Sequence, residues 1–173
     1  MAEIEKTRAR ERESVPGDRY EAVYRERAEF VERGKNGTVV VRESDRDWEI
    51  ARQGHLKFYL LPWTYPDTVL HDWFVFVHDV KKQSGKHRHQ GGLVLYVIEG
   101  EGATEVNGEM VEWEEGDLIL LPLDPNGIEH VHFNRGKTAK WLAFIYEPVF
   151  HHVASELTQT EVMAEFQQRL GGG

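Results

Sequence analysis

The chain has 173 residues, enough for one domain with a hydrophobic core. Its 30 acidic and 21 basic side chains give a formal charge of −9, which disfavours nucleic acid and anionic lipid as partners. The absence of cysteine excludes disulfides, thiolate metal sites and cysteine nucleophiles. No apolar run approaches the roughly 20 residues of a membrane span, and residues 1–14 lack the apolar core of a signal peptide, so we expect a cytoplasmic protein.

Residues 1–36 are predicted to form a charged N-terminal arm and a helix. Asp18 and Glu21 make a capping-box pattern at the start of the helix, and Gly34 can end it. A narrow apolar stripe within 20–31 recurs at helical spacing. This stripe needs a surface to pack on, and both the main domain and a second subunit satisfy that need.

Residues 37–153 are predicted to form a barrel. They contain many short runs rich in β-formers and bounded by Gly, Asn, Asp or Pro, with a hairpin signal at Asn107-Gly108. This pattern favours an all-β sandwich or barrel. The predicted strands are 38–42, 56–61, 73–80, 93–99, 103–106, 110–113, 118–121, 130–134 and 139–146.

Residues 154–173 are predicted to form a C-terminal helix and a glycine tail. Thr158 and Glu161 make a second capping-box pattern, and the apolar side chains of Val162, Phe166 and Leu170 fall on one helical face.

Four histidines have a spacing that indicates a metal site. His87 and His89 are two residues apart, and His130 and His132 repeat the pattern later in the chain. On a strand, residues i and i+2 share a face, so two such pairs can converge on one metal ion. The alternative is that these are ordinary solvated or core histidines.

The sequences around these histidines resemble the two conserved motifs of the cupin superfamily. The first is the run 85–102, with its glycines and His-x-His, and the second is 116–134, with Pro-x-Gly-x-x-His-x-x-x-Asn. The resemblance implies an all-β double-stranded β-helix, the cupin jelly-roll barrel, with helical appendages. It also assigns His87, His89 and His130 as metal ligands. The usual glutamate slot holds Leu93 or Val94, and Glu99 lies too far along the strand.

A site with three neutral ligands leaves a divalent ion its full charge, which suits an anionic bidentate substrate. The motif pattern is similar to that of three-histidine, ring-cleaving dioxygenases, which implies non-haem Fe(II), O2 and a small, oxygenated, aromatic substrate. Zn, Mn, Ni or Co would also suit imidazole ligands. His132 shares a face with His130 and is expected to be the catalytic, proton-handling residue, or else a fourth ligand.

Two other functions fit the same residues. One is a non-redox, metal-dependent isomerase, lyase or hydrolase, and the other is a ligand-binding cupin without catalysis. In each case we expect a homodimer, with 20–31 and 38–42 as the candidate interface.

Further side chains are candidates for the walls of a pocket or for the core. Strand parity points Leu93, Leu95 and Val97 inward and Tyr96 outward. Arg52, Gln53 and His55 could bind a substrate carboxylate or lie in solvent. The run 112–115 reads as a solvated turn. The aromatic and histidine candidates are Trp73, Phe74, Phe76, His78, Trp141, Phe144 and Tyr146.

Overall fold

The computed structural model describes residues 17–153 and 157–170. The predicted arm at 2–14 and the glycine tail at 171–173 lie outside the described residues. The domain boundaries proposed from the sequence stay predictions.

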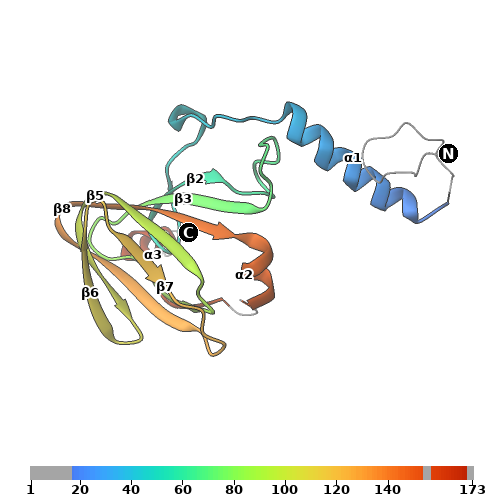
Figure 1. The fold of residues 1–173 in the computed structure, drawn as a ribbon. Coiled ribbons are helices and arrows are strands. Elements are labelled where there is room, and N and C mark those ends of the chain that lie inside the picture. The colour runs from blue at the N-terminus through green and yellow to red at the C-terminus, as the bar shows by residue number, and fades with distance from the viewer. Residues whose placement is uncertain (1–16, 154–156, 171–173) are drawn as a thin grey trace.

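The described residues form a curled, antiparallel β half-barrel of the cupin type, as the sequence predicts (Figure 1). One side of the barrel follows the strand order β1-β2-β3-β8-β4-β9, and β5 pairs with β6, β7 and β8. The strands are β1 (Glu49–Ile50), β2 (His55–Leu60), β3 (Trp73–Asp79), β4 (Lys86–His89), β5 (Leu93–Val106), β6 (Glu109–Glu114), β7 (Leu118–Leu121), β8 (Ile128–Tyr146) and β9 (Thr158–Glu161).

The two long strands β5 and β8 connect the parts of the barrel. One end of β8 pairs with β3 and the other with β4, and β5 runs along most of its length. The runs predicted separately as 93–99 and 103–106 are one strand, with a register shift between Gly100 and Gly102. The runs 130–134 and 139–146 likewise belong to one strand. The residues that suggested turns between these runs instead form irregularities in the pairing of two continuous strands.

The hydrophobic core follows the predicted alternation. Leu93, Leu95 and Val97 are buried on the inner face of β5, whereas Tyr96 points outward. Trp113 belongs to this core, being only 5% exposed, and 112–114 continue strand β6, so the predicted solvated turn at 112–115 is wrong except at Glu115. Packing of the indole ring inside the barrel extends β6 to Glu114.

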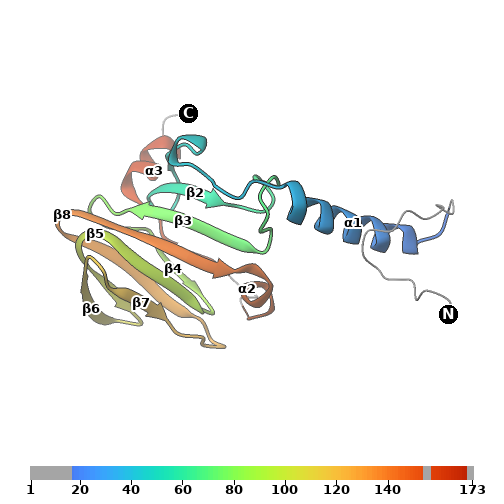
Figure 2. The same ribbon diagram turned by 45° about the horizontal axis from the view of Figure 1, so that its top comes forward.

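The predicted N-terminal helix is present as α1 (Tyr20–Asn36). The Asp18 carboxylate accepts the Tyr20 N–H, but Gly34 lies inside the helix, and Gly37 closes it by donating to the Arg33 carbonyl at 2.7 Å. No residue of α1 is buried, and both views show the helix projecting away from the barrel (Figures 1 and 2). No helix of the described chain is long and apolar enough to cross a membrane.

The prediction of a strand at 38–42 is wrong. Its only β contact among the described residues is an isolated bridge between Thr38 and Thr68, and Val39 is 80% exposed. The β-branched composition favours a strand only where a neighbouring strand and a packing surface exist. The chain instead leads into a short 3-10 helix, Glu43–Asp45.

The C-terminal segment differs from the predicted single helix. It forms strand β9 and then α3 (Ala164–Leu170), and a further helix, α2 (Glu147–Val153), follows β8 without having been predicted. β9 pairs with the free edge of β4, so this tertiary contact overrides the local helix-start signal at Thr158.

The close contact between Gly54 and His78 gives a test of the packing inside the barrel. A Cβ on Gly54 would lie 2.2 Å from Nε2 of the buried His78 ring, so Gly54→Ala should lower the free energy of unfolding by about 1–3 kcal/mol. Gly34→Ala is the matched control, because nothing lies within 4 Å of its Cβ position. Urea unfolding measures both variants. An unchanged midpoint for Gly54→Ala would contradict the contact.

Candidate metal centre

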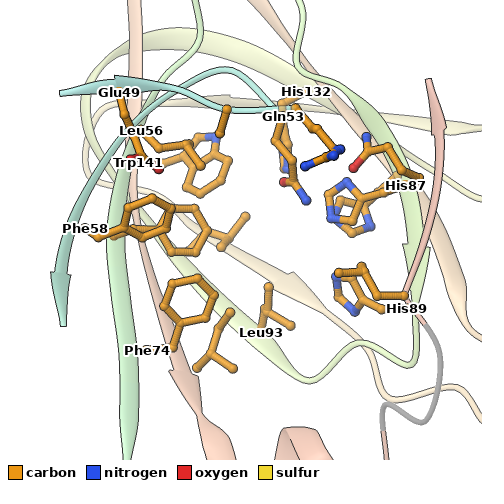
Figure 3. A pocket seen from close by; sticks show the side chains of 18 of the residues that line it. Glu49, Gln53, Leu56, Phe58, Phe74, His87, His89, Leu93, His132 and Trp141 are labelled. Atoms are coloured by element: carbon orange, nitrogen blue, oxygen red, sulfur yellow. The ribbon is translucent and has the colours of Figure 1, made fainter. Parts of the chain in front are cut away.

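The barrel encloses a cavity of about 610 Å³. Figure 3 shows histidine rings along one side and Leu56 with the aromatic rings of Phe58, Phe74 and Trp141 along the other. The cavity therefore has a polar end that could bind a metal and an apolar end that could hold a flat organic group.

Three histidines converge at the polar end. His87 and His89 come from the inner face of β4, and the β4–β8 register sets His130 directly opposite His87. One nitrogen from each ring lies within 4.8 Å of the others, and all three side chains are buried. The structure thus brings together the three residues that the sequence proposed as ligands.

Burial keeps these rings neutral. It lowers the pKa of His87 to about 4, with His89 adding repulsion, and lowers the pKa of His89 to about 4. The pKa of His130 falls well below its usual value, first through burial and then through His87. Near neutral pH each ring therefore offers a lone pair rather than a charge.

The hydrogen bonding of two of the three rings fits a cation between them. Gly91 N–H donates to Nδ1 of His89 at 2.9 Å, so the proton of this neutral ring lies on Nε2, and His89 has to give up that contact to bind a metal. The buried Nδ1 atoms of His87 and His130 have no hydrogen-bond partner in the described part of the chain. Buried polar atoms without partners are costly, and three convergent neutral imidazoles are a donor set for a divalent transition metal.

No carboxylate joins this cluster among the described residues. Leu93 fills the usual glutamate slot and lines the cavity, while Val94 points outward and is 40% exposed. Glu99 instead pairs with Lys140 at 2.6 Å. The candidate ligand set is three histidines, as the sequence indicates.

His132 lines the cavity beside this cluster and is held by a buried chain of hydrogen bonds. Trp113 Nε1 donates to Thr104 Oγ1 at 2.9 Å, and Thr104 Oγ1 lies 2.8 Å from His132 Nδ1. Because an indole N–H only donates, the Thr104 hydroxyl accepts the hydrogen bond from Trp113. It can then donate a hydrogen bond of its own to Nδ1 of His132. In that arrangement neutral His132 carries its proton on Nε2. The sequence did not predict these hydrogen bonds, since nothing in the spacing links Thr104 and Trp113 to His132.

His78 lies inside the barrel but does not line this cavity. Its ring is 4.8 Å from that of Trp141 and 6.4 Å from that of His132, and burial lowers its pKa to about 3. Packing against these rings makes it a neighbour of the site rather than a part of it.

The predicted aromatic wall is half correct. Phe74, Phe76 and Trp141 line the cavity, whereas Trp73, Phe144 and Tyr146 do not. Phe144 and Tyr146 are 38% and 43% exposed on the outer side of β8. Strand parity separates the two groups, and applying it to these strands would have found the difference.

The mouth of the cavity combines two distant segments. Arg52 and Gln53 line it, and Gln53 points toward His87 and His132 in Figure 3. His55 instead contacts Glu165 at 2.5 Å. Sequence analysis missed the contribution of the C-terminal segment, in which Phe166 stacks under Arg52, with 5.2 Å between the guanidinium carbon and the ring.

An internal cluster of histidines in an antiparallel jelly-roll barrel defines a class of metal-binding β-barrels. Residues 74–145 match the family described as the cupin domain. This part of the chain is therefore similar to the cupin domain, as its motifs indicated.

Curated relatives share part of this domain. A gentisate 1,2-dioxygenase from a Haloferax species is 37% identical over 51 residues, which cover 30% of this chain and 14% of the relative. A 5-aminosalicylate 1,2-dioxygenase from a Comamonas species is 35% identical over 69 residues, or 40% of this chain and 18% of the relative. The matches thus span less than a fifth of each relative.

Solved structures share the fold. The Streptomyces nucleoside dehydratase Pac13 superposes with a TM-score of 0.52 at 16% identity, covering 75% of this chain and 97% of that one. The polyketide cyclase RemF from Streptomyces resistomycificus gives a TM-score of 0.53 at 17% identity, covering 76% and 93%. At these identities the likeness concerns architecture alone.

The histidine cluster makes a direct prediction about metal content. Purified protein should hold about one divalent metal ion per chain, and His87→Ala or His130→Ala should lose it, because two imidazoles alone bind weakly. Elemental analysis measures the content, and His152→Ala, at an exposed position, is the control that should keep it. Full metal content in His130→Ala would place the ion elsewhere.

The hydrogen-bond chain predicts a stability effect that needs no metal. Thr104→Val keeps the shape of the side chain but leaves Trp113 Nε1 and His132 Nδ1 unpaired, so it should cost about 1–3 kcal/mol of unfolding free energy. Thr104→Ser restores the hydroxyl and should recover most of the loss. Chemical denaturation measures the stability of both variants. Equal stability of the Val and Ser variants would contradict these hydrogen bonds of Thr104.

Proposed function

We propose that this protein is a non-haem Fe(II) dioxygenase that acts on a small, oxygenated, aromatic substrate. The observation that carries the proposal is a buried three-histidine cluster that opens into an aromatic cavity and that no carboxylate of the described residues joins. His87, His89 and His130 would hold the ion. When bound, the iron would supply the redox chemistry and open coordination positions for substrate and O2.

The distribution of charge favours a substrate whose anionic group lies at the metal. The charged residues of the cavity lining, Glu49, Arg52 and Arg169, are exposed. The rest of the lining is apolar apart from the histidines, Gln53 and Gln159. A negative group inside would thus depend on the bound cation for compensation. The flat body of the substrate would lie against Phe74, Phe76 and Trp141.

His132 is proposed as the catalytic residue that handles a proton. Its Nδ1 lies 2.8 Å from Thr104 Oγ1, and in the tautomer that accepts the Thr104 hydrogen the Nε2–H would be the group that donates a hydrogen bond to a substrate oxygen. Burial keeps the ring neutral, since the pKa lies well below its usual value, with desolvation as the main cause and His78 next. Gln53 would add a second polar contact from the mouth.

The relatives support this reaction class. Both are ring dioxygenases by name, and gentisate and 5-aminosalicylate are small oxygenated aromatics. Their aligned segments cover only 14% and 18% of their length, so the activity comes to this chain as a proposal.

A non-redox reaction is the second candidate, because the site itself allows it. Three neutral ligands leave the full positive charge of Zn, Mn, Ni or Co available to polarise a substrate oxygen, and the proton-bearing His132 could serve an isomerase or lyase equally well. Turnover without O2 distinguishes this candidate from the first.

The test is oxygen uptake by protein reconstituted with Fe(II), with gentisate and 5-aminosalicylate as first substrates. We expect uptake that requires both iron and substrate and is absent with Zn. His132→Gln should retain iron and lower kcat by about 10²–10⁴-fold. Full turnover under strict anaerobiosis would replace the dioxygenase with the non-redox enzyme. Iron-loaded protein without turnover of any aromatic would reject both substrate class and reaction.

A further inference from the structure

The outer side of the barrel carries an apolar surface that the candidate site does not use. We call it the outer sheet face and define it by six side chains from β5, β7 and β8. They are exposed by 38–66%, although each is large and hydrophobic: Val94, Tyr96, Leu118, Leu120, Phe144 and Tyr146. Scattered exposed apolar residues are normal, but a contiguous group indicates a binding surface.

The strand register shows that these side chains are contiguous. Val94 pairs with Leu120 on one side and with Phe144 on the other. Two residues along, Tyr96 pairs with Leu118 and Leu142. Directly opposed residues on neighbouring strands lie on the same face, about 5 Å apart. The surface therefore contains two adjacent cross-strand rows without a charged side chain in either. Leu142, which is half-buried, completes the second row, and Tyr146 lies outside both rows, two residues beyond Phe144 on the same face of β8.

Within 17–153 and 157–170, no segment of the chain covers this face. The obvious candidate is α1, whose own apolar residues are unburied, but both views show it projecting away from the barrel (Figures 1 and 2). The six side chains keep their exposure in the presence of all other described residues.

We propose that the outer sheet face is a homodimer interface, in which two copies of this chain pack face to face across a two-fold axis. In such an isologous contact the same patch serves both subunits, so its uncharged rows meet uncharged rows. Two antiparallel sheets commonly pack face to face in this way, about 10 Å apart.

Charge does not oppose a second copy at this face. Each chain carries a formal charge of −9, so two copies repel one another wherever acidic surface meets acidic surface. The outer sheet face avoids that contact because its only ionisable groups are the phenols of Tyr96 and Tyr146. A basic partner protein would find no opposite charge on it.

The area is close to what a stable dimer needs. Side chains of this size have roughly 150–250 Å² each, so the measured exposures amount to about 600 Å² per copy. Two copies would bury about 1,200 Å², the lower limit of stable protein interfaces. We therefore expect a dimer that dissociates on dilution.

This interface differs from the one predicted from the sequence, which used 20–31 and 38–42. The two alternatives can be separated by single substitutions at exposed positions. Leu120 is 66% exposed on the outer sheet face and Phe30 is 57% exposed on α1, so a glutamate at either should leave the fold intact.

The experiment is sedimentation velocity of the full chain over a hundredfold range of concentration. Wild type and Phe30→Glu should both show a concentration-dependent dimer. Leu120→Glu should raise the dissociation constant at least tenfold, because symmetry brings two added carboxylates into one interface. Circular dichroism checks that each variant is folded.

Cross-linking gives a second measurement that does not depend on affinity. The chain lacks cysteine, so Tyr96→Cys introduces a unique thiol at the centre of the face. A short bismaleimide should join Tyr96→Cys into covalent dimers. Val40→Cys, whose position is 64% exposed and lies outside the face, should form no covalent dimer.

Three outcomes would overturn the proposal. The first is a wild-type monomer at every concentration. The second is a dimer that survives Leu120→Glu and is lost in Phe30→Glu, which would assign the contact to α1. The third is equal cross-linking of Tyr96→Cys and Val40→Cys. None of these results depends on metal or activity, so the proposed function is tested separately.

Discussion

The register between β4 and β8 is the constraint on which the candidate site depends. It sets His87 opposite His130, and the two-residue period of β4 adds His89 on the same face. A shift of one residue would turn both β4 histidines toward the exterior. The long strand β8 is fixed at its other end by seven paired positions on β3, so the candidate metal ligands inherit their alignment from the main body of the barrel.

Burial gives the site its chemical character. Five histidines lie in the interior, and desolvation keeps each of them neutral near pH 7. For the candidate metal ligands, neutrality means a lone pair rather than a charge. For His132 it means a ring whose Nδ1 pairs with the Thr104 hydroxyl, which itself accepts from Trp113. The apolar side chains on the opposite wall lower the local dielectric constant, which would strengthen the electrostatic interactions of a bound cation.

The sequence was most informative where local pattern and packing agree. The two His-x-His pairs, the glutamate slot filled by Leu93 and the inward side chains of β5 follow from spacing and strand parity, and the structure has them as predicted. It was least informative where a distant partner decides. Thr38 begins a β-branched run that no strand accompanies, and Thr158 begins a strand because β4 offers an edge. The link from Trp113 to His132 joins residues from separate strands, which spacing alone does not reveal.

The pairing of β9 with β4 has a consequence for how the cavity is reached. β9 has four residues, mostly exposed, and Gln159 donates to the Lys86 carbonyl across a sequence separation of 73. Short, exposed elements held by such contacts are the first to open in native proteins. Because Gln159 and Phe166 also line the cavity, release of this segment would widen the entrance while β3, β5 and β8 stay paired. Ligand exchange could then proceed on the timescale of local opening, with the histidine cluster kept in place by the rigid part of the sheet.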